Sequence, residues 1–167
     1  MKTRLFFIML IVCCISCESN KTISEHEKDK IKGEIKDVAD RMFQGCEEAN
    51  FEMASEALLD SPDFIFLING RTYTYQESVD AIKPKFSLLS DQKVTIIDEK
   101  YSILDESTVL YTTNCTFLEN YKDGHSSLND PTAILCIYKK INDEWKAIYA
   151  VESYVKKSLE NEDLEND

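Results

Sequence analysis

The sequence is poor in the residues on which most metal centres and many active sites depend. Its 167 residues include two histidines, His26 and His125, and four glycines. Neither histidine has a partner at the spacing of a metal site, which excludes a histidine-based metal centre. The glycines are scattered, and no glycine-rich phosphate loop, Ser-His-Asp order or zinc pattern is present. We therefore expect neither a metal nor a cofactor.

Positive charge is also scarce. The chain has 19 Lys and Arg residues against 31 Asp and Glu residues, and its formal net charge is −12. No cluster of basic residues interrupts this acidic background, so a nucleic-acid backbone would be repelled. We expect no nucleic-acid partner. Apolar residues make up 43% of the chain and charged residues 30%, which is the composition of one globular domain.

Long apolar runs are absent except near the start of the chain. Residues 5–15 form an apolar block of 11 residues, preceded by the basic residues Lys2 and Arg4. The block is too short to span a bilayer, but it has the length of the apolar region of a signal peptide. This order of basic and apolar residues predicts export.

A small residue, Ser16, and then Cys17 follow the apolar block. The order resembles the lipobox of bacterial lipoproteins, although position 14 is Cys where leucine is usual. The resemblance implies a signal peptide at 1–16, a lipid on Cys17 and a cell-envelope location, anchored to a bacterial membrane. A cut before Cys14, a plain secretory signal, a membrane anchor and a C-x-x-C redox pair are the alternatives.

Three cysteines, Cys46, Cys115 and Cys136, lie in the part of the chain expected to fold. An odd number does not suit a disulfide framework. At most one internal disulfide can form, and buried thiols that pack as small apolar groups are the alternative.

The first half of the chain has the pattern of helices and one hairpin. Residues 17–29 are polar and read as a tether, whereas residues 31–46 carry one apolar stripe at helical spacing. Asn50 is expected to cap a short helix, and Asn69-Gly70 lies between two apolar runs as in a tight hairpin. A further helix is expected from residue 76, interrupted by Pro84.

The second half has the pattern of strands. Four runs rich in β-branched and aromatic residues are expected to form an antiparallel meander: 94–104, 108–121, 132–141 and 144–154. Residues 122–131 read as a flexible connection, and the acidic tail 156–167 as disordered. The order of helices and then strands predicts an α+β domain over residues 30–155. We expect its long first helix to cross the concave face of a curved antiparallel sheet, which leaves a cone with an opening for a small ligand.

The chain from about residue 31 to residue 154 resembles the NTF2-like superfamily, in particular its SnoaL-like and DUF4440-type bacterial members. The matching features are the long first helix, the hairpin segment "LLDSPDFIFLINGRTYTY", the helix at 76–86 and the last strand, "DEWKAIYAVES". In the last strand Trp145, Lys146 and Ser153 fit the family pattern, whereas Tyr149 and Val151 stand where histidine is common. The resemblance implies a cone-shaped fold, often dimeric through the outer face of the sheet. It also implies one of many functions, from isomerases, dehydratases and hydrolases to non-catalytic binding modules.

The loop Asn142-Asp143 predicts a register for the last two strands. With two loop residues, Tyr138 faces Ala147, Cys136 faces Tyr149, and Ile134 faces Val151. Strand alternation then places one set of side chains toward the helices. The candidate cavity-lining residues from this argument are Tyr149, Tyr138, Ser153 and Trp145, and all of them can equally be core residues.

Two acidic residues complete the candidates. Asp63 precedes the hairpin near the expected mouth of the cone, where a buried acid could act as a base. Glu152 is expected on the outer face, together with an apolar patch for a homodimer that Leu135, Ile137, Ile148 and Ala150 would form. We expect a lipid-anchored protein that binds a small ligand or a protein partner without catalysis. The alternative is a cofactor-independent SnoaL-like enzyme, an isomerase, dehydratase or hydrolase.

Overall fold

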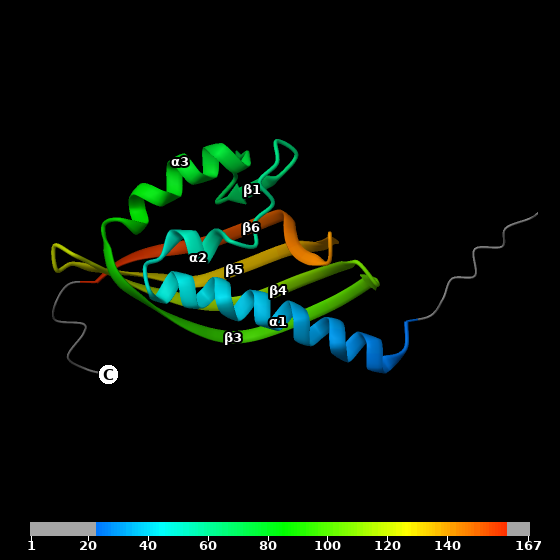
Figure 1. Ribbon diagram of the computed structural model, residues 1–167. Helices are drawn as coiled ribbons and strands as arrows, with labels where there is room; N and C mark the ends of the chain where they lie inside the picture. The colour runs from blue at the N-terminus through cyan, green and yellow to red at the C-terminus, as the bar shows by residue number, and fades with distance from the viewer. Residues whose placement is uncertain (1–22, 160–167) are drawn as a thin grey trace, which may run out of the picture.

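The computed structural model describes residues 23–159, in which three helices pack on a six-stranded sheet (Figure 1). The expected signal peptide, the lipid on Cys17 and most of the acidic tail lie outside the described residues. None of the helices within residues 23–159 has the length and apolar composition needed to cross a bilayer.

Helix α1 spans Glu25–Glu47 and begins at a capping box. The side chain of Ser24 accepts a hydrogen bond from the backbone N–H of Glu27, and the Glu27 carboxylate accepts one from the backbone of Ser24. Residues 25–29, assigned from the sequence to the tether, are therefore helical. The predicted apolar stripe faces the sheet, where Ile35 and Ala39 are fully buried.

Helix α2 spans Phe51–Ser55 and packs closely against the end of α1. Asn50 caps it as predicted, by accepting a hydrogen bond from the N–H of Met53. The two helices meet at Gly45, where a Cβ atom would lie 2.3 Å from the backbone nitrogen of Ala54. Only glycine fits there, and α2 lies between α1 and α3 as a result (Figure 1).

Helix α3 spans Tyr75–Phe86 and begins at a second capping box, formed by Thr74 and Glu77. It includes Pro84 in its last turn. Its Phe86 ring meets the Phe51 ring of α2 edge to face, with 5.5 Å between the ring centroids. A Lys83–Glu52 ion pair also joins α3 to α2.

The sheet has the order β2-β1-β6-β5-β4-β3. Its strands are β1 (Ile65–Ile68), β2 (Arg71–Tyr73), β3 (Leu89–Asp105), β4 (Thr108–Tyr121), β5 (Ser126–Ile141) and β6 (Glu144–Leu159). The last four form the predicted antiparallel meander. The predicted hairpin β1–β2 joins through a parallel pairing of β1 with β6, so the sheet is mixed. It is curved and does not close (Figure 1).

Three strands extend beyond their predicted ends, and the first of them, β3, begins at Leu89 instead of at residue 94. β5 begins at Ser126, inside the segment expected to be a flexible connection, and β6 continues to Leu159, past the expected end of the domain at 155. The extensions of β5 and β6 pair with each other, Ser126 with Leu159 and Leu128 with Lys157. Backbone pairing thus orders polar residues that lack the side-chain pattern of a strand.

The predicted register of β5 and β6 is correct as far as Tyr138, which faces Ala147. Beyond this pair a β-bulge leaves Ile148 unpaired, and Ile137 faces Tyr149. The predicted pairs of Cys136 with Tyr149 and of Ile134 with Val151 are therefore wrong.

The bulge exchanges the two faces of β6. Ala147 and Ala150 are both buried, with 1% and 3% of their surface exposed, although three positions separate them. Past the bulge, alternate residues starting at Ala150 point to the concave face, and Glu152 is one of them. Tyr149 and Ser153 lie on the outer face, opposite to the predicted placement.

Candidate functional site

The concave face has an aromatic end and a polar end. We use "aromatic end" for Glu99, Tyr101, Tyr111 and Tyr138, and "polar end" for Gln92, Glu119, Ser127, Asn129 and Glu152. Of the buried polar residues in the described chain, most lie at or beside the polar end, where β3 supplies Gln92 and β5 supplies Ser126, Ser127, Asn129 and Thr132. Buried polar groups need hydrogen-bond partners, so the polar end cannot be explained by apolar packing alone.

Glu119 on β4 is the centre of a hydrogen-bond network. One of its oxygens, Oε2, accepts hydrogen bonds from the hydroxyls of Tyr121 and Ser127, both at 2.7 Å. The same oxygen accepts one from Lys156 Nζ at 2.8 Å, and Oε1 accepts one from Asn129 Nδ2 at 3.0 Å. Burial alone would raise the pKa of Glu119, but the hydrogen bonds from Lys156, Tyr121 and Ser127 outweigh it and hold the pKa below its usual value. Glu119 is therefore an ionised and fully satisfied carboxylate.

Glu152 on β6 is the opposite case. It is half-buried, and its cross-strand neighbours are Ile134 on β5 and Ile68 on β1. Within the described residues its carboxylate has no hydrogen-bond or ion-pair partner. Burial raises the pKa of Glu152 to about 7, the charge of Glu119 adds to the rise, and Lys85 of α3 opposes it. This carboxyl group therefore changes its protonation state near neutral pH.

Asn129 has a second unpartnered acceptor. Its Nδ2 atom donates to Glu119, which fixes the orientation of the amide. Its Oδ1 atom is buried and has no hydrogen-bond partner in the described part of the chain. A buried acceptor without a donor costs free energy, so a donor from outside the chain would be stabilised there.

Three thiols surround the polar end. Cys46, Cys115 and Cys136 are all free, so the described residues contain no disulfide among them. Burial raises the pKa of each thiol to about 12, and the charge of Glu152 adds to each rise. Thiols with such a pKa are protonated at neutral pH and are poor nucleophiles. Their shared interaction with Glu152 places its carboxylate among α1, β4 and β5.

At the aromatic end, the hydroxyls of Tyr101 and Tyr111 both have hydrogen-bond partners. Tyr111 is fully buried, and its hydroxyl donates to Glu99 Oε1 at 2.7 Å. The Tyr101 hydroxyl donates to the same oxygen at 3.2 Å. Burial, with the charge of Glu99, raises the pKa of both tyrosines. Both hydroxyls therefore have a structural role.

The candidate residues from the sequence do not come together. Tyr138 and Trp145 are in the core, with 1% and 7% of their surface exposed, and the Trp145 indole N–H donates to Glu34. Tyr149 and Ser153 lie on the outer face, and Asp63 is exposed in the turn before β1.

The sequence pattern did not single out Glu119 or Asn129, and it placed Glu152 on the outer face instead of the concave one. Glu119 could have been found, because it has the same alternation in β4 as the buried residues Tyr111 and Cys115. Glu152 could not, because its position depends on the bulge at Ile148.

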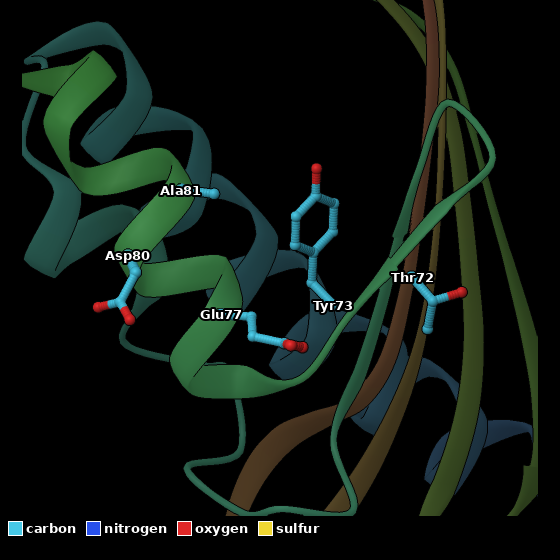
Figure 2. A pocket seen from close by; sticks show the side chains of 5 residues that line it. All are labelled: Thr72, Tyr73, Glu77, Asp80 and Ala81. Atoms are coloured by element: carbon cyan, nitrogen blue, oxygen red, sulfur yellow. The ribbon is translucent and has the colours of Figure 1, made fainter.

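Two hollows lie outside the concave face. One, of about 400 Å³, is an open depression between α3 and β2, where Tyr73 stands beside Glu77 (Figure 2) and Asp80 completes the acidic lining. Glu77 is already used in the capping box of α3. The other, of about 250 Å³, lies among α1, α2 and the start of β6 and includes Met42, Met53 and Trp145. Within residues 23–159, no group of three His, Cys, Asp or Glu residues could hold a metal ion.

No protein-family model matches this sequence, and no curated protein matches it. Solved structures do match. The dehydrochlorinase LinA-type3 from Novosphingobium barchaimii LL02, which acts on hexachlorocyclohexane, is 13% identical, with a TM-score of 0.66 over 83% of this chain and 96% of that one. A putative scytalone dehydratase from Novosphingobium aromaticivorans DSM 12444 is 8% identical, with a TM-score of 0.68 over 82% and 93%. An NTF2-like protein from Cytophaga hutchinsonii ATCC 33406 is 20% identical, with a TM-score of 0.58 over 74% and 98%. At these identities the likeness shows the fold.

Proposed function

We propose that this chain, which has the NTF2-like α+β cone fold, binds a small molecule at the polar end of its cone. The observation that supports the proposal is the Glu152 carboxylate, which the bulge in β6 directs to the concave face and which has no partner there. An unpartnered, half-buried carboxylate lowers stability, and functional sites are where such costs are retained. Binding without catalysis needs nothing further from the chain.

Catalysis is the second candidate, and the pKa of Glu152 favours it. A carboxylate with a pKa of about 7 is suited to accept and return a proton at neutral pH. Two of the structural neighbours are named as a dehydrochlorinase and a putative dehydratase. A cofactor-independent isomerase, dehydratase or hydrolase of the SnoaL-like type would use Glu152 as its base.

Native mass spectrometry tests the binding proposal. The chain from residue 18 onward should carry a co-purified small molecule, and the Glu152→Gln variant should lose it. The control variant Asp63→Asn removes one exposed carboxylate and should keep the ligand. Retention of the ligand by Glu152→Gln would exclude the polar end as its site. Once the ligand is identified, chemical conversion by the wild type but not by Glu152→Gln would establish catalysis.

Lipid anchoring is a further part of the proposed function. Its support is the basic, apolar and small-residue order before Cys17. Six residues separate Cys17 from Ser24, the cap of α1, so the tether is shorter than the sequence suggested. The Cys17→Ala variant should leave the membrane fraction. Unchanged membrane retention would rule the lipid anchor out.

A homodimer through the outer face of the sheet is also proposed. A cross-strand row of apolar side chains supports it, with Ile65 beside Tyr149, Tyr149 beside Ile137, and Ile137 beside Leu110. Ala150, which was expected in this patch, is buried on the concave face instead. The wild type should have dimer mass in solution and Ile137→Asp monomer mass. A monomeric wild type would contradict the dimer.

A further inference from the structure

The hollow of about 250 Å³ among α1, α2 and the start of β6 is apolar inside and charged at its rim. Its apolar lining is Val38 and Met42 of α1, Met53 of α2, Ala57 just after α2, and Trp145 of β6. We use "methionine hollow" for the hollow with this lining. The lining side chains other than Trp145 are half-buried, so they still present apolar surface to the hollow. Concave apolar surface of this kind is typical of a ligand pocket.

Backbone contacts hold the walls of the methionine hollow in place. The N–H of Ala147 donates to the Ala57 carbonyl at 2.7 Å, and the N–H of Leu59 donates to the Ala147 carbonyl at 3.0 Å. These hydrogen bonds hold the segment after α2 against β6, and the close approach at Gly45 holds α2 against α1. The hollow is therefore formed by the chain itself, before any ligand binds.

The Trp145 ring is also held in one orientation. Its indole N–H donates to Glu34 Oε2 at 2.7 Å, and Lys140 Nζ lies 5.4 Å from the ring centroid. The polar group of the indole is thus already used, so Trp145 offers the hollow only apolar ring surface. Met42 and Met53 add adaptable side chains whose sulfur atoms make favourable contacts with aromatic rings. This lining suits an aromatic ring.

The rim of the hollow carries two ion pairs, Arg41–Glu56 and Lys146–Glu144. Their two positive and two negative charges sum to zero, so the rim gives neither an anion nor a cation a net attraction. A charged ligand would also lose part of its hydration in the apolar hollow. The rim therefore favours an uncharged ligand.

Arg41 has unused hydrogen-bond donors at this rim. Its Nε atom donates to Glu56 Oε2 at 2.6 Å, which is the one hydrogen bond of its guanidinium group among residues 23–159. A guanidinium group has five N–H donors, so those of the two terminal nitrogens remain available. Lys146 Nζ, by contrast, contacts the Glu144 carboxylate at 3.1 Å and the Glu56 carbonyl at 3.3 Å. Arg41 is therefore the group at the rim that can donate to a ligand.

We propose that the methionine hollow binds an uncharged molecule with one aromatic ring and one hydrogen-bond acceptor, to which Arg41 donates. An apolar cavity of about 150 Å³ holds one benzene molecule, so a hollow of about 250 Å³ has room for one ring and a short substituent. No residue of the polar end lines this hollow. The site is thus separate from the one in the proposed function.

Four probes that share one benzene ring test the proposal: acetophenone, toluene, benzoate and benzylammonium. Carbon-13 NMR of labelled methionine methyl groups reports on the hollow in the full-length chain, held in lipid nanodiscs because residues 5–15 are apolar. The Met42→Leu and Met53→Leu variants assign the two signals, and empty nanodiscs correct for probe taken up by lipid. Acetophenone should shift both signals saturably and bind about 2- to 10-fold more tightly than toluene, the range for one net hydrogen bond. Benzoate and benzylammonium should bind more weakly than acetophenone.

A pair of variants tests the role of Arg41. Arg41→Gln should lower the affinity for acetophenone to that for toluene and leave toluene binding unchanged. Lys36→Gln is the matched control, because Lys36 is a cation of α1 that is paired with Asp40 and does not line the hollow. It should leave both affinities at their wild-type values. Equal affinities of the wild type for acetophenone and toluene, or tighter binding of either charged probe, would overturn the proposal. The absence of a saturable shift at Met42 and Met53 with all four probes would overturn it as well.

Discussion

The two ends of the concave face use carboxylates in opposite ways. At the aromatic end Glu99 accepts hydrogen bonds from Tyr101 and Tyr111, and the tyrosine rings pack tightly. At the polar end Glu119 is saturated with donors, while Glu152 and Asn129 retain free acceptors. The difference teaches that a buried polar residue indicates function only when its hydrogen-bonding capacity is left unused.

The largest expected effect is at the aromatic end. Tyr138 has 1% of its surface exposed and packs against Tyr111 with 6.3 Å between ring centroids. Tyr138→Ala should lower the free energy of unfolding by about 3–5 kcal/mol, because it removes a buried ring and leaves a cavity. Denaturant unfolding measures the loss. A loss below about 1 kcal/mol would mean that this end is not packed as described.

The pH dependence of stability is the second effect, and it belongs to the polar end. The pKa of Glu152 is about 7 in the folded chain and 4.5 in an unfolded one. Between these values the folded state holds a proton that the unfolded state has released, so stability should decrease as the pH rises from 4.5 to 7 and change no further above. The decrease from this residue is roughly 3 kcal/mol.

Glu152→Gln should remove that part of the pH dependence. The difference in unfolding free energy between wild type and variant, measured by urea titration at pH 5 and pH 8, isolates it from all other groups. Parallel pH profiles for the two proteins would contradict the placement of Glu152.

A third change connects the two carboxylates of the polar end. Glu119→Gln removes the charge that helps to raise the pKa of Glu152, so that pKa should fall. The variant also weakens charge-assisted hydrogen bonds from Lys156 and Asn129, at a cost of about 1–3 kcal/mol. NMR titration and thermal unfolding measure the two effects. An unchanged pKa of Glu152 would show that the two carboxylates do not interact.

The smallest effects are expected at Tyr149 and Ser153, which the sequence predicted to line the cavity. Tyr149→Phe and Ser153→Ala alter hydroxyls on the outer face, and no hydrogen bond of either hydroxyl is found in the described chain. Each should change the unfolding free energy by less than about 0.5 kcal/mol and leave ligand binding as in the wild type. Loss of binding in Tyr149→Phe would restore the predicted register.

Sequence patterns were sufficient for the fold because its elements are locally encoded. The stripe from Ile31 to Cys46, the Asn69-Gly70 turn and the alternation in β4 each follow from side-chain periodicity. The site was not encoded in this way. One extra residue, Ile148, reverses the faces of β6, and no local pattern distinguishes a strand with a bulge from one without.

The polar extensions of β5 and β6 were not predicted from the sequence, for a related reason. Residues 126–129 and 156–159 pair through their backbones, although their side chains resemble those of a loop or tail. These extensions carry Ser127, Asn129 and Lys156, which are the partners of Glu119. The part of the sheet that builds the polar end is thus the part that side-chain patterns describe least well.

The pKa of Glu152 is the most direct test of this account, because the bulge, the concave placement and the missing partner all determine it. A carbon-13 NMR titration of the glutamate side chains, with Glu152→Gln for assignment, measures it in solution. The account predicts a midpoint near 7, well above that of the other glutamates. A midpoint near 4.5 would place Glu152 in water on the outer face and contradict the proposed site.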